Sequence, residues 1–194
     1  YKGPGMGSVL LLLVSCVLTN NFLFTRFPGV YLFRGDRVKS AALLGLFTTL
    51  LLAAASLLSW MLYTWVLVPA NLGYFNTLAT LLIVLLLAQI IKGLWSRRGE
   101  EGAARAKATM PMLLINCLVM GVLLSNLAEG SDLLTSFFTG LFAGLGFLVA
   151  IVLMAGVQER LTTSDIPKAL KGVPIDLVSA GLIAAAFMGF VGLA

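Results

Sequence analysis

The feature that most constrains this chain is an uncharged apolar run from residue 40 to residue 91. A helix needs about 20 apolar residues to cross a hydrocarbon core about 30 Å thick, so this run can hold two membrane spans. A turn between them is predicted in the segment YTWVLVPANLGYFN, because Pro69, Asn71 and Gly73 disfavour helix. With 11% charged residues, far below the roughly 25% of soluble domains, the chain is predicted to be an integral membrane protein.

The same pattern repeated along the chain predicts an all-α fold of six membrane-spanning helices. We expect residues 7–194 to form a single membrane domain, and we interpret residues 1–6 as a tag remnant or a disordered leader. The six spans are predicted at 8–28, 40–62, 75–95, 110–127, 134–157 and 175–194.

The distribution of basic residues predicts how these helices are oriented. The loops after the second and fourth spans contain no Lys or Arg, only Glu129 and Asp132. The loops after the first, third and fifth spans carry most of the Lys and Arg side chains: Arg34, Arg37, Lys39, Lys92, Arg97, Arg98, Arg105, Lys107, Arg160, Lys168 and Lys171. By the positive-inside rule, the basic loops face the cytoplasm and both termini face outside. Because the charge is divided among short loops, no nucleic-acid-binding surface is expected.

The sequence also matches itself at an offset of about 95 residues. The segment LTNNFL aligns with LLINCL, and GLFTT, residues 45–49, aligns with GLFAG, residues 140–144. The two halves, about 7–95 and 108–194, would each contain three helices, so the second half would enter the membrane from the opposite side. Inverted repeats are typical of transport proteins, whose interrupted helices meet near the bilayer centre. Within the second half, the glycines of GLFAG are typical of close helix packing.

The first and fourth spans are the predicted interrupted helices. Pro28 lies near the end of the first span and Pro111 at the start of the fourth. The same two spans contain Asn20, Asn21 and Asn116, and the repeat pairs Asn21 with Asn116. One interpretation is that these amides form hydrogen bonds between helices. The other is that they mark a pathway or site at the membrane centre, as intramembrane polar groups often do.

Other chemistry is restricted by what the chain lacks. The sequence has no histidine, which excludes imidazole metal ligands and histidine acid–base catalysis. It has no nucleotide-binding or metalloprotease motif. Its two cysteines, Cys16 and Cys117, both lie in predicted spans, so a structural disulfide between them is not expected.

Three segments resemble a known family. LTNNFLFTRFPGVYLFRG is similar to the first-helix motif of the RnfA/RsxA and NqrE membrane subunits, and MPMLLINCLVMGVLL is similar to their fourth-helix motif. ERLTTSDIPKALKGVPIDLVSAGLIAAAFMGFVGL resembles their last loop and helix. From about Gly7 to Ala194, the chain therefore resembles the Rnf/Nqr ion-translocating oxidoreductase family.

The resemblance implies a multi-pass protein of a bacterial or archaeal inner (plasma) membrane. It would be a subunit of a translocase, not catalytic alone, that couples electron transfer of the ferredoxin/NAD type to Na⁺ or H⁺ movement. Its expected partners are a homologous RnfE/NqrD-like membrane subunit, other Rnf subunits that carry flavin and iron–sulfur groups, and membrane lipid. A non-redox transporter, a channel and a membrane scaffold remain alternatives.

In this family the homologous pair shares a [2Fe–2S] cluster, with one cysteine from each half of each subunit. The resemblance assigns the fourth-helix ligand to Cys117, but it places Tyr31 where the first-helix cysteine is expected. A phenol seldom replaces a thiolate in such clusters. Three alternatives stay open: the cluster is absent, it is ligated incompletely or by another residue, or an irregular helix brings Cys16 to it.

Overall fold

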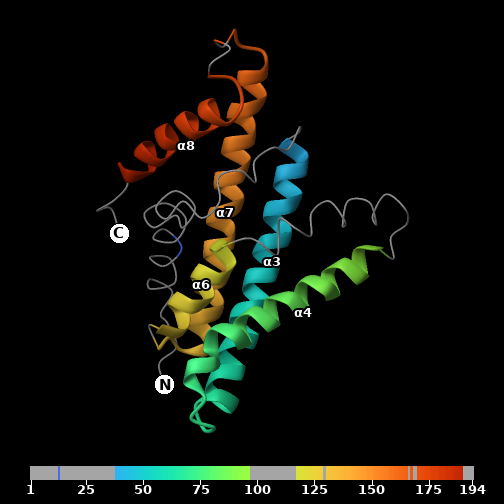
Figure 1. Cartoon of the computed structure of the whole chain (residues 1–194), viewed down its shortest axis with the longest axis vertical. Helices are drawn as coiled ribbons and strands as arrows, with labels where there is room; N and C mark the ends of the chain where they lie inside the picture. Colours follow the sequence, from blue (N-terminus) through green and yellow to red (C-terminus); the bar gives the residue numbers. More distant parts are fainter. Residues whose placement is uncertain are drawn as a thin grey trace. The chain divides into compact units, whose positions relative to one another are not determined.

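The computed structural model describes residues 13, 38–96, 117–128, 130–165, 167 and 170–189. Its regular elements are helical, and the described residues contain no strand, which confirms the predicted all-α class. The helices are α3 (Val38–Leu62), the π-helix η3 (Tyr63–Leu67), the 3₁₀-helix η4 (Gly73–Phe75), α4 (Asn76–Ser96), α6 (Cys117–Ala128), α7 (Leu133–Thr162) and α8 (Val173–Met188), labelled in Figure 1 where there is room.

Three of these segments are long and apolar enough to cross a membrane: Ala41–Leu67, Gly73–Gly93 and Leu133–Thr162. They confirm the spans predicted at 40–62, 75–95 and 134–157. The shorter apolar helices Leu118–Ala128 and Val173–Met188 coincide with the described parts of the fourth and sixth predicted spans. Apart from Leu13, the first predicted span lies outside the described residues.

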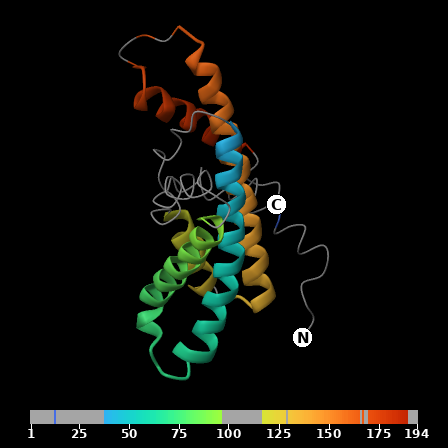
Figure 2. The ribbon, with the colours of Figure 1, turned by 90° about the vertical axis from the view of Figure 1, so that its right-hand side faces the viewer.

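The predicted turn between the second and third spans is present. The chain leaves α3 through the π-helix, in which the Val68 amide donates to the Tyr63 carbonyl five residues earlier at 2.9 Å. Asn71 then adopts a φ of 54°, in the left-handed region that asparagine tolerates better than most residues. Figure 2 shows α4 returning from this turn beside the end of α3. The hairpin is fixed there by a hydrogen bond of 3.1 Å between the hydroxyls of Ser59 and Thr80.

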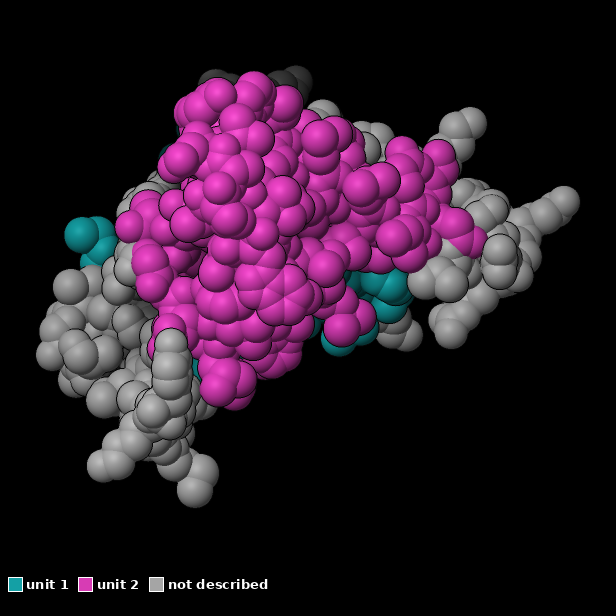
Figure 3. Space-filling view, turned by 90° about the horizontal axis from the view of Figure 1, so that it is seen from below, with its two compact units in different colours: residues 1–49, 142–194 teal, residues 50–141 magenta. Residues whose placement is uncertain are grey.

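The chain divides into two compact units, coloured separately in Figure 3: residues 1–49 with 142–194, and residues 50–141. In the first unit, glycines allow α3 and α7 to approach very closely. A Cβ added at Gly144 would lie 2.6 Å from the Thr49 Cα, and one added at Gly45 would lie 3.0 Å from the Leu148 Cα. Residue 45 of α3 lies against residue 148 of α7, and residue 49 lies against residue 144. The residue numbers run in opposite directions, so the two helices are antiparallel here.

In the second unit, the same two helices again approach at a glycine. A Cβ added at Gly140 of α7 would overlap the Ser56 side chain and would lie 3.0 Å from the Leu52 carbonyl oxygen. The predicted role of the GLFAG glycines in close helix packing is therefore confirmed for Gly140 and Gly144. Small residues at such contacts let helix backbones pack closely inside a membrane, where burial of apolar surface contributes little.

The third span differs from the others in its exposure. Only 17% of the most apolar window of Gly73–Gly93 is buried, against 56% for each of the other two long spans. Its exposed apolar side chains include Leu78, Leu82, Leu86 and Ile90. In a bilayer, such a face is suited to lipid or to another protein of the membrane rather than to water.

Candidate functional site

The residues singled out from the sequence lie almost entirely outside the described structure. Asn20, Asn21, Tyr31 and Asn116, together with Cys16, are not described. Cys117 is the first residue of α6 as the structure describes it, and only its backbone is placed. Within the described part of the chain, no group of three or more His, Cys, Asp or Glu residues could hold a metal ion. The predicted centre of these asparagines and Cys117 stays a prediction.

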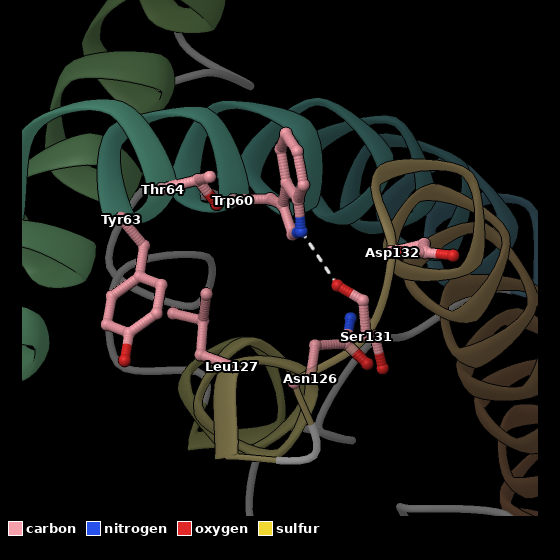
Figure 4. Close-up of a pocket in the computed structure, with 8 residues that line it drawn as sticks. Trp60, Tyr63, Thr64, Asn126, Leu127, Ser131 and Asp132 are labelled. Atoms are coloured by element: carbon pink, nitrogen blue, oxygen red, sulfur yellow. Dashed lines mark hydrogen bonds between the residues drawn. The ribbon is translucent and has the colours of Figure 1, made fainter. Parts of the chain in front are cut away.

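The described residues contain a different polar site. A cavity of about 180 Å³ lies in the second unit, where the end of α3 meets the loop between α6 and α7. Figure 4 shows most of its lining side chains. The lining residues are Trp60, Tyr63, Thr64, Asn126, Leu127, Gly130, Ser131 and Asp132.

Two hydrogen bonds hold the walls of this cavity together. The Trp60 Nε1 donates to the Ser131 carbonyl oxygen at 2.7 Å, which joins α3 to the α6–α7 loop. The Asn126 Nδ2 donates to the Ser136 carbonyl oxygen at 3.3 Å, which joins the end of α6 to the first turn of α7. Asn126 is only 4% exposed, although it lines the cavity. The cavity is therefore lined by a buried amide held in a fixed position.

The loop itself is a tight connection. Its Gly130 has a φ of 61°, a conformation that glycine adopts without steric cost. The Ser131 amide donates to the Asn126 carbonyl, and the Ser136 amide donates to the Asp132 carbonyl at 2.8 Å as α7 begins. The Trp60 bond places this loop beside the end of α3.

Two buried hydroxyls of the second unit, outside the cavity lining, have no hydrogen-bond partner among the described residues. They are Ser56 Oγ, one turn before Trp60 in α3, and Ser136 Oγ, in the first turn of α7. Helical hydroxyls usually donate to the carbonyl four residues earlier. Thr139 does so in α7 at 2.9 Å, and Thr48 does so in α3 at 2.8 Å. Ser56 and Ser136 depart from that pattern.

Sequence patterns did not predict this cavity. One available signal was Asn126, which lies inside the predicted fourth span and is as unusual at membrane depth as Asn116. Trp60 and Ser136 carried no comparable signal, because tryptophan at a span end and serine inside a span are common in membrane helices. Their importance follows from the contact between α3 and the α6–α7 loop, which are far apart in the sequence.

The Trp60 bond leads to a direct prediction. Trp60→Phe should destabilise the protein by about 1 kcal/mol, because it leaves a partly buried carbonyl without its donor. Thermal unfolding of the purified protein measures the loss. Trp65→Phe is the control, since Trp65 is 65% exposed and its replacement should change stability by less than about 0.5 kcal/mol. Equal losses for the two variants would contradict the assigned role of the bond.

Comparison with known proteins identifies the family. Residues 9–194 match the family described as "Rnf-Nqr subunit, membrane protein". The chain is 37% identical over 188 residues to an RnfA-type subunit from Acetobacterium woodii, named as part of the "Na(+)-translocating ferredoxin:NAD(+) oxidoreductase complex". The match covers 96% of this chain and 98% of that protein.

A second relative comes from Escherichia coli (strain K12 / DH10B) and is named as a subunit of the "Ion-translocating oxidoreductase complex". It is 37% identical over 190 residues, covering 97% of this chain and 98% of that protein. The corresponding protein from Shigella boydii matches equally well. The chain therefore belongs to the Rnf-Nqr family of membrane subunits.

Proposed function

We propose that this protein is the RnfA-type subunit of an Rnf-type complex, in which electron transfer of the ferredoxin/NAD type is coupled to Na⁺ or H⁺ translocation. The observation that carries the proposal is the nearly full-length match to subunits named for that activity in Acetobacterium woodii and Escherichia coli. Because its relatives are named as subunits of such complexes, the chain would act together with the flavin and iron–sulfur subunits rather than be catalytic alone.

Removal of the protein from its complex tests this proposal. In membrane vesicles, a complex that lacks this chain should lose ion transport driven by reduced ferredoxin and NAD⁺, and re-expression of the chain should restore it. The peripheral subunits should still reduce artificial electron acceptors, because their own redox groups remain. Unchanged ion transport without this chain would contradict the proposal.

The described helices support the inverted repeat that this function would use. The helix α7 begins 95 residues after α3, at Leu133 against Val38, which is the offset found within the sequence. The helices that follow them, α4 and α8, begin at Asn76 and Val173, close to the same offset. Two successive helices of the first half thus have counterparts in the second half at a nearly constant offset in the sequence.

The contact between α3 and α7 in the first unit also supports the repeat. Thr49 and Gly144 occupy equivalent positions in the two halves, and the Gly144 position lies against Thr49. A contact between equivalent residues of antiparallel elements is what a two-fold axis between the halves would produce. In this arrangement the first and fourth spans would also face each other across the axis, so Asn21 and Asn116 would meet near the membrane centre.

The chemistry of the available ligands does not fit a cluster held by four cysteines. This chain has two cysteines in all, and only Cys117 occupies a position that the family uses. Tyr31 stands at the second position. Even with two thiolates from a homologous RnfE/NqrD-like partner, the cluster would therefore have only three thiolate ligands. We propose that the shared [2Fe–2S] cluster is altered or absent, and we assign no electron-transfer step to it.

A non-redox role is the second candidate. The observation that favours it is Tyr31 in place of the expected thiolate ligand. An inverted-repeat transporter, a channel or a scaffold would need no cluster. One measurement distinguishes the two roles, namely electron flow between ferredoxin and NAD⁺ through the assembled complex. This flow should require the protein only if the protein takes part in electron transfer.

A further inference from the structure

The cavity between α3 and the α6–α7 loop lies where membrane spans end. One wall comes from the end of the span Ala41–Leu67, and Asp132 of the opposite wall directly precedes the span Leu133–Thr162. Trp65 and Tyr74, which are 65% and 76% exposed in the turn after the first of these spans, are typical aromatic residues of a membrane interface. In a bilayer the cavity therefore lies at the height of the lipid headgroups.

The charge of the cavity disfavours an anionic ligand. Its described lining contains no Lys or Arg, and residues 129–132 of the loop include Glu129 and Asp132 but no basic residue. Phosphate groups and anionic lipids are bound by Lys and Arg side chains. Figure 4 shows the Asp132 carboxylate turned away from the Trp60 indole, so this negative group belongs to the rim of the cavity. The rim is suited to attract a positively charged group.

A buried acceptor lies in the lining. The Asn126 side chain is only 4% exposed, and its Nδ2 already donates to the Ser136 carbonyl oxygen. Its Oδ1 accepts no hydrogen bond from a described residue. Buried polar groups are nearly always hydrogen-bonded, so an amide oxygen left free at a cavity indicates a ligand that donates. An ammonium group offers three donors and no acceptor.

The opposite wall is aromatic. Trp60, Tyr63 and Thr64 occupy positions i, i+3 and i+4, so they share one face of the helical segment. Figure 4 shows both rings on this side of the cavity. The Trp60 Nε1 is bound to the Ser131 carbonyl oxygen, which fixes the indole in place. Aromatic rings attract ammonium groups through their electron-rich faces, as in proteins that bind choline.

We propose that this cavity binds the ammonium group of a zwitterionic phospholipid of the phosphatidylethanolamine type. The ammonium donates to the Asn126 Oδ1, and the aromatic wall and the Asp132 carboxylate stabilise its charge. The cavity volume of about 180 Å³ holds the nitrogen and its two neighbouring carbons, since one water-sized group needs about 30 Å³. Lipid binding here does not depend on the translocation function proposed above.

Labelling by a photoreactive lipid tests this site. The complete complex is placed in vesicles of phosphatidylethanolamine and phosphatidylglycerol, with a trace of either lipid carrying a diazirine at the glycerol end of an acyl chain. Mass spectrometry measures the labelling of residues 60–67 and 126–132. The phosphatidylethanolamine probe should label them at least about three-fold more than the phosphatidylglycerol probe, because only the first carries an ammonium group. Equal labelling would overturn the proposal.

Asp132→Asn tests the charge at the rim. This change removes the carboxylate but keeps a side chain that caps helices equally well, so the protein should still fold. Labelling by the phosphatidylethanolamine probe should fall about three-fold, as expected for the loss of an exposed charge pair, while labelling by phosphatidylglycerol should not fall. Asp176→Asn, in the first turn of α8 and outside the cavity lining, is the matched control and should change neither.

Tyr63→Leu tests the aromatic wall. The loss of the ring should lower labelling by the phosphatidylethanolamine probe about three-fold. Tyr74→Leu is the matched control, because Tyr74 is an exposed interfacial tyrosine outside the lining. Unchanged labelling in both Asp132→Asn and Tyr63→Leu would overturn the site.

A competition experiment distinguishes a lipid from a soluble amine. An excess of free ethanolamine in the medium should leave the labelling unchanged, because the lipid is concentrated in the membrane beside the cavity. Loss of labelling in free ethanolamine would show that the cavity takes a soluble amine, which would overturn the assignment to a lipid.

Discussion

Gly144→Ala is expected to destabilise the protein strongly, whereas Gly156→Ala in the same helix should leave it unchanged or slightly more stable. A Cβ at position 144 would lie 2.6 Å from the Thr49 Cα, a backbone atom that cannot rotate away. Overpacking of this kind costs about 1–3 kcal/mol, and contact with a backbone atom places this case at the upper end.

Gly156 is the matched control because a Cβ there meets no described atom within 4 Å. Replacing an unobstructed helical glycine with alanine normally gains about 0.5–1 kcal/mol of helix propensity. Thermal unfolding of both variants in the same detergent measures the difference. A stable Gly144→Ala protein would mean that α3 and α7 do not pack as closely as described.

The second large effect concerns the cluster ligands. In the assembled complex, Tyr31→Cys should create or greatly increase a [2Fe–2S] electron paramagnetic resonance signal, because it supplies the thiolate that the family places at this position. Adding Cys117→Ser to that variant should abolish the signal. The measurement is a spectrum of the purified complex before and after reduction.

The control for this experiment is Cys16→Ser, which should leave the spectrum unchanged. Cys16 lies fifteen residues before Tyr31, about 22 Å away if the segment is helical. A full-strength cluster signal in the wild-type complex that Cys16→Ser removes would contradict this interpretation. It would show that Cys16 takes the place of the missing ligand.

The membrane fold was largely predictable from the sequence. Span length and charge placement predicted α3, α4 and α7, because the bilayer imposes a minimum apolar length that the sequence displays directly. The turn at Asn71 was predictable because Pro69 and Gly73 interrupt an otherwise continuous apolar run. The glycines of GLFAG pointed correctly to a close helix contact.

The cavity was not predictable in the same way. Its walls come from the end of α3 with η3 and from the end of α6 with the α6–α7 loop, and the Trp60 bond to Ser131 joins the two sides across a separation of 71 residues. Periodicity and composition describe each helix alone and contain no information on such pairings. The lack of a hydrogen-bond partner for the Ser136 hydroxyl depends on the rotamer and packing of the side chain, which the sequence alone does not show. Asn126 alone could have been noticed beforehand.

The contact between Thr49 and Gly144 also has a consequence for how a duplicated gene could have produced this chain. A residue on the axis between two repeated halves meets its own copy. Two threonines would overlap where a single Cβ already approaches a backbone atom to 2.6 Å, and two glycines would leave a gap between the helices. If the chain arose by duplication, both halves first carried the same residue, and close packing at this point would have required one copy to diverge. Asymmetry between the halves would then be a condition of their tight association.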